Sequence, residues 1–316
     1  MNNVAGGTLL IDKYGRLLTH ARVSITNKCN YSCIFCHKEG INWSTANELS
    51  PEDWSFFAST VSRLGIMYFK LTGGEPLTRS DVVSIVKGIK PYVKEVSMTT
   101  NGSLLDKYAG ELLDSGLDRV NVSLHSLNKE VFRELTGGVL ERVIKGIEAA
   151  VGLGLVVKLD YLVTSLNAHE YMDIINYAES LGVDLNIIEL IPLGLASEKY
   201  MELHSQLSNV EKYLEEAAVS KTKYYFQSRP TYVMPSGIKV TLIKGSCNPE
   251  LCASCTRIRV TPEGKLKTCI YVNEPLIDAG DYIRRRDEEG LIKTLVKANE
   301  FRKPFFLPQF SSKPSQ

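Results

Sequence analysis

Three cysteines lie close together near the start of the chain, in the segment CNYSCIFC. Cys29, Cys33 and Cys36 follow a short apolar stretch, and the whole chain of 316 residues has only seven cysteines. Cysteine thiolates are the protein ligands of iron–sulfur clusters, and a four-iron cluster normally takes four of them. Three thiolates would leave one iron open, as catalytic metal sites leave a position open for a further ligand. The spacing therefore predicts such a cluster.

Two other interpretations of this triplet remain open on the residues alone. A zinc ion could take the adjacent His37 as its fourth ligand, or the thiols could be packed without metal. Clustered cysteines in a chain with no sign of export favour metal binding or catalysis over disulfides.

A second cysteine set occupies the segment CNPELCASCTRIRVTPEGKLKTC. Cys252 and Cys255 stand in a predicted turn, and Cys269 lies on the returning strand of a predicted hairpin. This arrangement predicts a second metal site. With Cys247 included, four thiolates could close a structural zinc site or a fully ligated cluster. Since three thiolates already satisfy the spacing, we expect Cys247 not to be a ligand.

Two further motifs carry groups suited to ligands. On a strand, Arg257 and Arg259 would point to the same side, and two guanidiniums beside a metal suit a phosphate-bearing substrate. A solvated edge strand is the alternative. In LTGGEP (71–76) the glycines allow the backbone to approach a ligand closely, and Glu75 suits an ammonium group. Taken alone, GGEP would be a tight turn.

A strand–helix alternation would position these motifs. Near-continuous apolar strands alternate with amphipathic helices, which predicts βαβ units and a parallel sheet. Six units are too few for a closed eight-fold barrel, so we expect a partial (β/α)6 barrel, with a doubly wound sheet as the alternative. The predicted strands are 22–26, 67–72, 95–100, 119–124, 156–163 and 185–191.

The pattern changes after about residue 195. A helix over 208–218, two hairpins and a final helix over 288–300 predict a smaller α+β domain. The predicted division is a barrel domain over 1–195, with 1–21 leading in, and a C-terminal domain over 196–316 that carries the second cluster. We expect the last residues to be disordered.

Composition limits the class of protein. The chain is 44% hydrophobic and 23% charged, with a net charge of +1, which is ordinary for a globular protein and gives no reason to expect nucleic-acid binding. No signal peptide or apolar run of membrane-spanning length is evident, so we expect a cytoplasmic protein with no membrane partner.

The CxxxCxxC spacing resembles that of radical S-adenosylmethionine (SAM) enzymes, in which the methionine part of SAM binds the open iron. From YGR (14–16) to the last helix, the chain is similar to the GTP 3′,8-cyclase family of molybdenum-cofactor (molybdopterin) biosynthesis. The segments that carry this resemblance occur in the family's order: RVSITNKCNYSCIFCHKEG, LTGGEP, MTTNG, RVNVSLHS and CASCTRIRVTPEGKLKTC.

The resemblance implies a lyase that uses a 5′-deoxyadenosyl radical to convert GTP to (8S)-3′,8-cyclo-7,8-dihydroguanosine 5′-triphosphate. It further implies an electron donor and a cyclic pyranopterin monophosphate synthase downstream, and it is compatible with a homodimer. Two rivals stay open, namely a radical SAM peptide-modifying enzyme with an auxiliary cluster and a non-catalytic zinc-stabilised binding module.

The resemblance also assigns roles to individual residues. Two [4Fe–4S] clusters would be held by Cys29, Cys33 and Cys36, and by Cys252, Cys255 and Cys269. The residues expected to contact SAM are Phe35, Gly74, Glu75, Ser123 and Ile191. The residues expected to contact GTP are Arg22, Lys70, Thr99, Lys158, Arg257, Ile258 and Arg259.

Some positions depart from the family pattern. Asn186 stands where an arginine is expected, Tyr68 replaces a common lysine, and Ile191 replaces an expected methionine. Many family members end in Gly-Gly, a tail that assists the reaction, whereas this chain ends in KPSQ. These differences leave the basic pocket and the role of the tail as questions for the structure.

Overall fold

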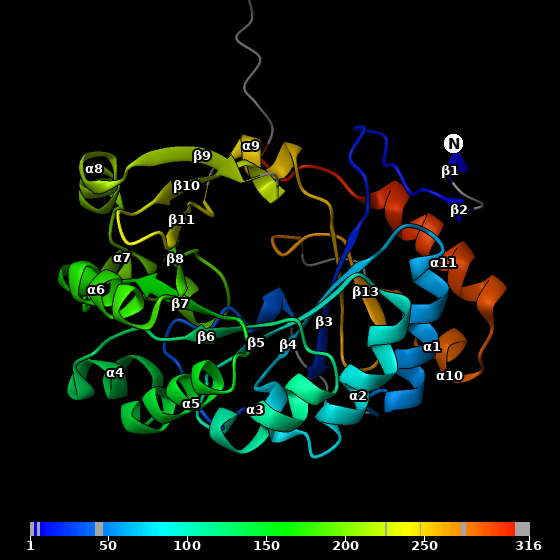
Figure 1. Ribbon diagram of the computed structural model, residues 1–316. Coiled ribbons are helices and arrows are strands. Elements are labelled where there is room, and N and C mark those ends of the chain that lie inside the picture. Colours follow the sequence, from blue (N-terminus) through cyan, green and yellow to red (C-terminus); the bar gives the residue numbers. More distant parts are fainter. Residues whose placement is uncertain are drawn as a thin grey trace, which may run out of the picture.

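A single large sheet forms the centre of the protein. The computed structural model describes residues 3–4, 7–41, 47–224, 226–246, 248–272 and 276–306. Twelve strands are hydrogen-bonded in the order β14-β13-β12-β3-β4-β5-β6-β7-β8-β11-β10-β9. In Figure 1 this sheet curves into an open barrel with helices on its outer side. The predicted partial barrel is confirmed.

The six central strands are parallel and lie within two residues of their predicted bounds. Their apolar residues face outward toward the helices, while alternate residues face into the barrel. The strands are β3 (His20–Thr26), β4 (Tyr68–Gly73), β5 (Glu95–Thr100), β6 (Arg119–Ser123), β7 (Val157–Val163) and β8 (Asp184–Glu189).

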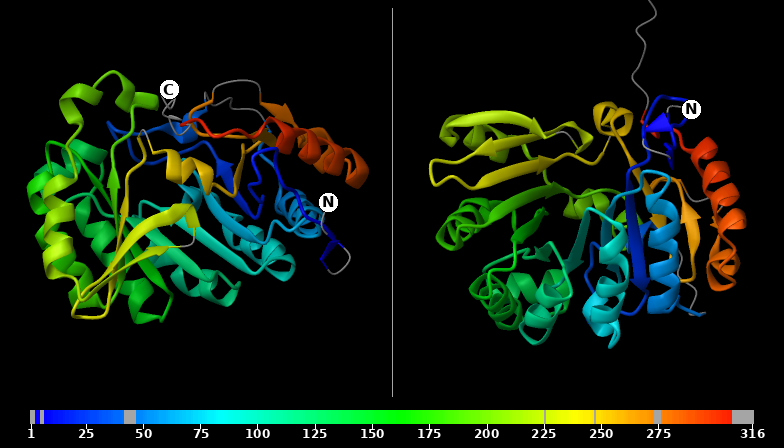
Figure 2. Two further views of the ribbon diagram at one scale, coloured as in Figure 1. Left: turned by 90° about the horizontal axis from the view of Figure 1, so that it is seen from above. Right: turned by 45° about the vertical axis from the view of Figure 1, so that its right-hand side comes forward.

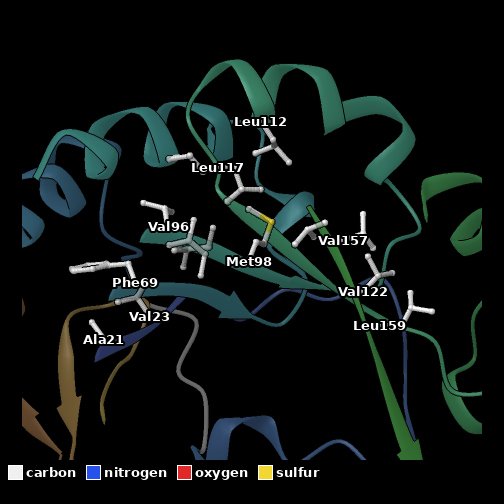
Figure 3. Packing of buried hydrophobic residues seen from close by; sticks show 14 of the residues in the cluster. Ala21, Val23, Phe69, Val96, Met98, Leu112, Leu117, Val122, Val157 and Leu159 are labelled. Carbon is white, nitrogen blue, oxygen red and sulfur yellow. The ribbon is translucent and has the colours of Figure 1, made fainter. Parts of the chain in front are cut away.

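The main core fills the layer between the sheet and the outer helices. Figure 3 shows Val96 and Met98 of β5 facing Leu112 of α3 and Leu117 after it. All four side chains are buried, so this layer supplies most of the hydrophobic stabilisation of the barrel. The helices that follow the strands are α1 (Pro51–Ser62), α2 (Val82–Ile89), α3 (Leu105–Asp114), α4 (Lys129–Thr136), α5 (Leu140–Gly152) and α6 (Tyr171–Leu181).

The C-terminal part of the chain extends the same sheet at both edges. Both predicted hairpins form, as β10 (Arg229–Val233) with β11 (Lys239–Ile243), and as β12 (Arg257–Val260) with β13 (Lys265–Lys267). Strand β11 pairs parallel with β8, and β12 pairs parallel with β3. The hairpins therefore extend the barrel wall at both edges rather than forming a sheet of their own (Figure 2).

The remaining elements lie around these edges. Among the described residues no helix is long and apolar enough to cross a membrane. Cys247 lies outside the described residues. The C-terminal tail from residue 307, for which we expect disorder, also lies outside them. The further elements are β1 (Asn3–Val4), β2 (Gly7–Thr8), α7 (Tyr200–Leu203), α8 (Ser208–Ala217), β9 (Ser220–Tyr224), α9 (Pro249–Ala253), β14 (Ile277–Asp278), α10 (Gly280–Arg284) and α11 (Glu288–Phe301).

Candidate active site

The two cysteine sets lie at opposite ends of the barrel interior. Cys29, Cys33 and Cys36 (the first triad) follow the C-terminal end of β3. Cys252, Cys255 and Cys269 (the second triad) gather at the other end, because β12 runs parallel to β3 and the first two of these cysteines precede β12. Cys269 follows the antiparallel strand β13, which returns to that end. Strand β3, seven residues and about 23 Å long, separates the two triads.

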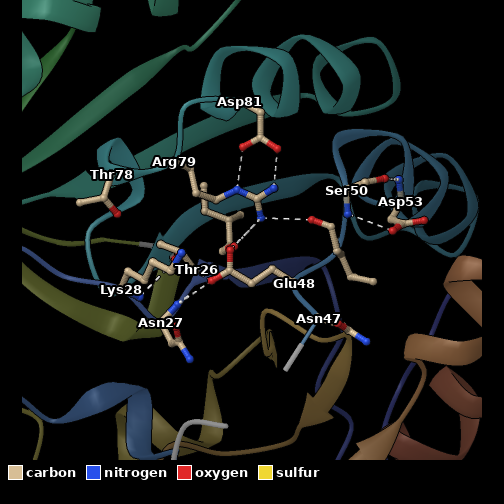
Figure 4. Close-up of polar contacts among 12 residues, drawn as sticks. Thr26, Asn27, Lys28, Asn47, Glu48, Ser50, Asp53, Thr78, Arg79 and Asp81 are labelled. Atoms are coloured by element: carbon tan, nitrogen blue, oxygen red, sulfur yellow. Dashed lines mark hydrogen bonds and ion pairs between the residues drawn. The ribbon is translucent and has the colours of Figure 1, made fainter. Parts of the chain in front are cut away.

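A polar network fixes the end of β3 just before the first triad (Figure 4). Arg79 donates to both carboxylate oxygens of Asp81, at 2.7 and 2.6 Å, and to the backbone carbonyl of Ile25 at 2.6 Å. Glu48 accepts a hydrogen bond from the Thr26 hydroxyl at 2.7 Å and forms an ion pair with Arg79. The backbone entering the first triad is thus held by charged groups that lie well outside the cysteine motif.

The LTGGEP segment packs directly against the backbone that leads to Cys29. The Gly74 N–H donates to the carbonyl of Thr26 at 2.8 Å, and the Glu75 N–H donates to the carbonyl of Lys28 at 2.7 Å. A Cβ at Gly74 would overlap the carbonyl oxygen of Lys28, so only glycine permits this approach. The motif therefore has a structural role in positioning the first triad, whatever ligand it also meets.

Glu75 itself is buried and hydrogen-bonded within the protein. Its carboxylate accepts from the Thr100 hydroxyl at 2.5 Å and from the N–H groups of Asn101 and Leu77 at 2.6 and 3.0 Å. Burial raises the pKa of Glu75 to about 7, against these hydrogen bonds. This carboxylate contributes to the electrostatic environment of Cys29, whose pKa is raised first by burial and further by Glu75.

Basic side chains line the barrel between the triads. Register places Arg259 beside Arg22, and Arg22 beside Lys70, on three neighbouring strands. Lys70 donates to the Asn121 side chain at 2.8 Å, and Lys158 on β7 lies beside Asn121. Burial holds the pKa of Lys70 well below its usual range, with Asp160 opposing this effect. The side chains that point into the barrel here are therefore polar and charged rather than apolar.

Glu39 is the buried acid among these cations. It sits three residues after Cys36, in the short 3₁₀ turn Lys38–Gly40, and its side chain is only 4% exposed. Arg22 donates through Nε to both carboxylate oxygens at 3.0 Å and through Nη2 to Oε1 at 2.6 Å, and Arg259 donates to Oε2. Burial alone would raise the pKa of Glu39, but the two guanidiniums hold it well below its usual range.

The comparisons with known proteins agree with this geometry. The sequence model of the Radical SAM superfamily matches residues 23–178, and that of Molybdenum Cofactor Synthesis C matches residues 183–306. A protein of Saccharolobus islandicus named "Probable GTP 3′,8-cyclase" is 42% identical over 306 residues, 94% of this chain and 99% of the relative. A protein of the same name from Sulfurisphaera tokodaii is 44% identical, covering 87% of this chain and 88% of the relative.

The chain belongs to the GTP 3′,8-cyclase family of radical SAM enzymes.

Solved structures support the fold. Streptococcus suis SuiB bound to S-adenosylmethionine matches with a TM-score of 0.67 at 16% identity, covering 85% of this chain and 65% of that chain. The structure named native anSMEcpe with bound AdoMet matches with a TM-score of 0.60 at 16% identity, covering 87% and 82%. At such low identity the likeness shows the fold alone.

The donor chemistry of both triads fits the clusters of a radical SAM enzyme. Burial raises the pKa of Cys33 to about 12, with Cys36 and Cys29 adding to the effect, so these thiols affect one another electrostatically. Burial would also raise the pKa of Cys255, but Arg257 lowers it overall. No three His, Cys, Asp or Glu side chains within the described ranges converge on a single metal ion. A [4Fe–4S] cluster does not require its ligands to converge on one point, because each thiolate binds a separate iron.

Other residues expected to contact SAM lie near the mouth of the barrel. The Phe35 ring lies edge-on to His125 at 4.8 Å, where His125 accepts a hydrogen bond from the Leu162 N–H. His125 is thus a satisfied structural histidine beside an expected adenine contact. Ser123 ends β6, and Ile191 follows β8.

The residues expected to contact GTP do not all face the interior. Thr99 is half-buried beside Asn121, in line with the basic residues. Ile258 is fully buried in the main apolar core, between the two arginines of β12 in sequence. Any contact of Ile258 with GTP would therefore come from its backbone. Tyr68, in place of a lysine, stacks on His20 at 4.7 Å.

Asn186 replaces the expected arginine without leaving a gap in the hydrogen bonding. Its amide donates to Asp160 at 2.6 Å, and the amide of Asn121 donates to the same oxygen at 2.9 Å. The position thus contributes no positive charge to the barrel interior and instead helps to orient a carboxylate. The basic residues that remain there stand on β12, β3, β4 and β7.

Sequence patterns had not indicated several of these residues. Glu39 contacts Arg259, which is 220 residues away in the chain. Arg79 contacts Ile25, which is 54 residues away. The only local signal for Glu39 is an acidic residue before Gly40, directly after the triad. Asp160 could have been noticed as a charged residue within a buried strand pattern, which usually marks a functional position.

Proposed function

We propose that this chain cyclises GTP to (8S)-3′,8-cyclo-7,8-dihydroguanosine 5′-triphosphate, as a lyase in the first step of molybdopterin biosynthesis. The observation that carries the proposal is the row of basic side chains on β12, β3 and β4 between the two cysteine triads. An anionic substrate bound there would lie between the first triad and the second. The name of the relatives at 42% identity supports GTP as that substrate.

Each cysteine triad has a separate role in this proposal. The first triad would hold a [4Fe–4S] cluster that, with SAM, supplies a 5′-deoxyadenosyl radical. The second triad would hold an auxiliary [4Fe–4S] cluster facing the guanine. Arg22, Arg257 and Arg259 would orient the nucleotide and keep its ribose within contact distance of the reactive carbon, which is the main contribution of the protein.

The proposal extends to the enzyme's surroundings. A cytoplasmic location, an electron donor and a cyclic pyranopterin monophosphate synthase that consumes the product are inferred from the family alone. A homodimer is part of the same expectation.

Anaerobic reconstitution tests the function. We expect about eight irons per chain, four for each cluster. With SAM, a reductant and GTP, the protein should release 5′-deoxyadenosine together with a cyclised nucleotide. If 5′-deoxyadenosine forms at the same rate without GTP and no nucleotide product appears, a peptide-modifying activity would be favoured. Bound zinc and no iron would contradict both enzymatic alternatives.

A further inference from the structure

We infer that Glu39 is a positioning residue that orients Arg22 and Arg259 for the substrate. The inference rests on the proposed function, because it assigns these arginines to GTP. It adds a residue that touches neither cluster nor substrate but determines where the substrate-binding groups stand.

The first support is the way Glu39 uses each guanidinium. Arg22 reaches Glu39 through Nε and Nη2, and Arg259 reaches it through Nη1. Thr72 donates to the same carboxylate at 3.1 Å and accepts from Arg22 at 3.2 Å. Within the described part of the chain, Nη1 of Arg22 and both Nε and Nη2 of Arg259 make no hydrogen bond. Glu39 thus fixes some of the N–H groups of each guanidinium, and the other N–H groups remain available to a ligand.

The second support is the backbone that carries Glu39. Lys38 and Glu39 have φ angles of 46° and 50°, which residues with a Cβ rarely adopt. Such strain persists only where the surroundings impose it, and it occurs disproportionately at functional sites. The N–H of Glu39 donates to Nδ1 of His37 at 2.9 Å, which helps to hold this conformation.

The third support is the position of the loop 37–40 between the two triads. It follows Cys36 directly, and its glycine, Gly40, lies against the backbone of Ile270, the neighbour of Cys269, so that a Cβ there would overlap the Ile270 carbonyl oxygen. Glu39 also binds Arg259, which stands between Cys255 and Cys269 in the chain. One short loop thus contacts the segments of both triads.

Glu39 could either position the two arginines or only neutralise their charge. These two roles predict opposite effects of Glu39→Gln on GTP affinity. If Glu39 only neutralised the arginines, Glu39→Gln would leave more positive charge for the triphosphate and would tighten binding. If Glu39 orients them, the same substitution frees both guanidiniums to adopt other rotamers and weakens binding. Preorganisation of this kind lowers the entropy that a ligand must give up.

The experiment is an anaerobic titration of the reconstituted full-length protein with GTP and, separately, with SAM. For Glu39→Gln we expect the dissociation constant for GTP to rise at least tenfold, with iron content and SAM affinity unchanged. The amount of nucleotide product per 5′-deoxyadenosine should fall, because a misplaced ribose leaves the radical unproductive. A purely structural defect would lower iron content, SAM affinity and both products together.

Two further variants keep the result interpretable. Glu39→Asp retains the charge, but its side chain is one methylene shorter. Its affinity for GTP should therefore lie between that of the wild type and that of Glu39→Gln. If Glu39→Gln fails to fold, this variant alone decides, and wild-type affinity in it would overturn the inference. Glu288→Gln removes the exposed ion pair of Glu288 with Arg63 and should leave both affinities unchanged.

The outcomes separate the inference from the function on which it depends. Wild-type protein that binds GTP, together with Glu39→Gln that binds it equally well or more tightly, overturns the positioning role alone. Wild-type protein that binds SAM but no GTP overturns the proposed function and this inference with it.

Discussion

The two cysteine triads differ in the charges that surround them. Around the first triad, burial raises the pKa of Cys29, and Glu75 and Cys36 both raise it further. The pKa of Cys36 is raised mainly by burial, while Glu39 raises it further and Lys38 lowers it. Around the second, three guanidiniums act on Cys255, those of Arg257, Arg302 and Arg16. The surroundings of the second triad are therefore more cationic than those of the first.

The triads also differ in how their backbones are held. The first triad follows a strand end that is fixed through the glycine approach of LTGGEP and the bond from Arg79 to Ile25. The second is held by buried arginine side chains. Arg302 donates to the carbonyl of Cys255 at 2.7 Å, and Arg16 donates to that of Cys252 at 2.9 Å. Close backbone packing therefore contributes to the support of the first triad alongside a charged hydrogen bond, whereas charged hydrogen bonds to the cysteine carbonyls support the second.

The largest expected effect comes from removing a ligand of the first triad. Cys33→Ser should abolish both 5′-deoxyadenosine and nucleotide product, a loss of more than about a thousandfold, because radical formation depends on this cluster. Iron should fall to about half of the wild-type content. Iron analysis and product chromatography under anaerobic conditions measure both. Retained 5′-deoxyadenosine formation would contradict the role of the first triad.

Removing a ligand of the second triad should distinguish the functions of the two triads. For Cys255→Ser we expect iron again to fall to about half, with nucleotide product lost but slow 5′-deoxyadenosine formation retained. The reason is that the first triad lies at the other end of β3 and keeps its own support. Equal loss of both products in the two variants would show that the triads do not act separately.

The charged support of the second triad should be costly to remove. Arg302 is 1% exposed and also forms an ion pair with the buried Asp12 at 3.6 Å, so Arg302→Met leaves a buried carboxylate with fewer partners. We expect a loss of about 3–5 kcal/mol in the free energy of unfolding. The matched control is Arg63→Met at an exposed ion pair, which should cost about 0–1 kcal/mol. Urea denaturation of both variants tests the difference, and equal values would contradict it.

The packed support of the first triad should show a smaller effect. Gly74→Ala inserts a methyl group against the Lys28 carbonyl and should destabilise the protein by about 1–3 kcal/mol, with SAM affinity reduced. Gly152→Ala is the control, because a Cβ there meets no atom within 4 Å at the end of helix α5. It should be neutral or stabilising by up to about 1 kcal/mol. If both changes behave alike, close packing does not position the first triad.

Local patterns were sufficient to predict much of this architecture. The six barrel strands and both hairpins follow from apolar runs and turn residues that act within a few positions. The predicted strand bounds hold because each strand is buried on its outer face and its sequence records that burial. By contrast, the parallel pairing of β11 with β8 and of β12 with β3 depends on contacts between distant segments, which no local pattern encodes.

The sequence by itself determined which residue types could act as ligands and on which strands they stand. The spacing of the cysteines and the alternation of Arg257 and Arg259 are local properties of the chain; the spacing predicted an iron–sulfur site, and the resemblance of the motifs to a known family implied a radical SAM enzyme. Only the tertiary structure decided that the triads lie at opposite ends of β3 and that Glu39 joins Arg22 to Arg259. The physical reason is that the curved sheet brings together charges far apart in the chain, where burial makes their interactions strong.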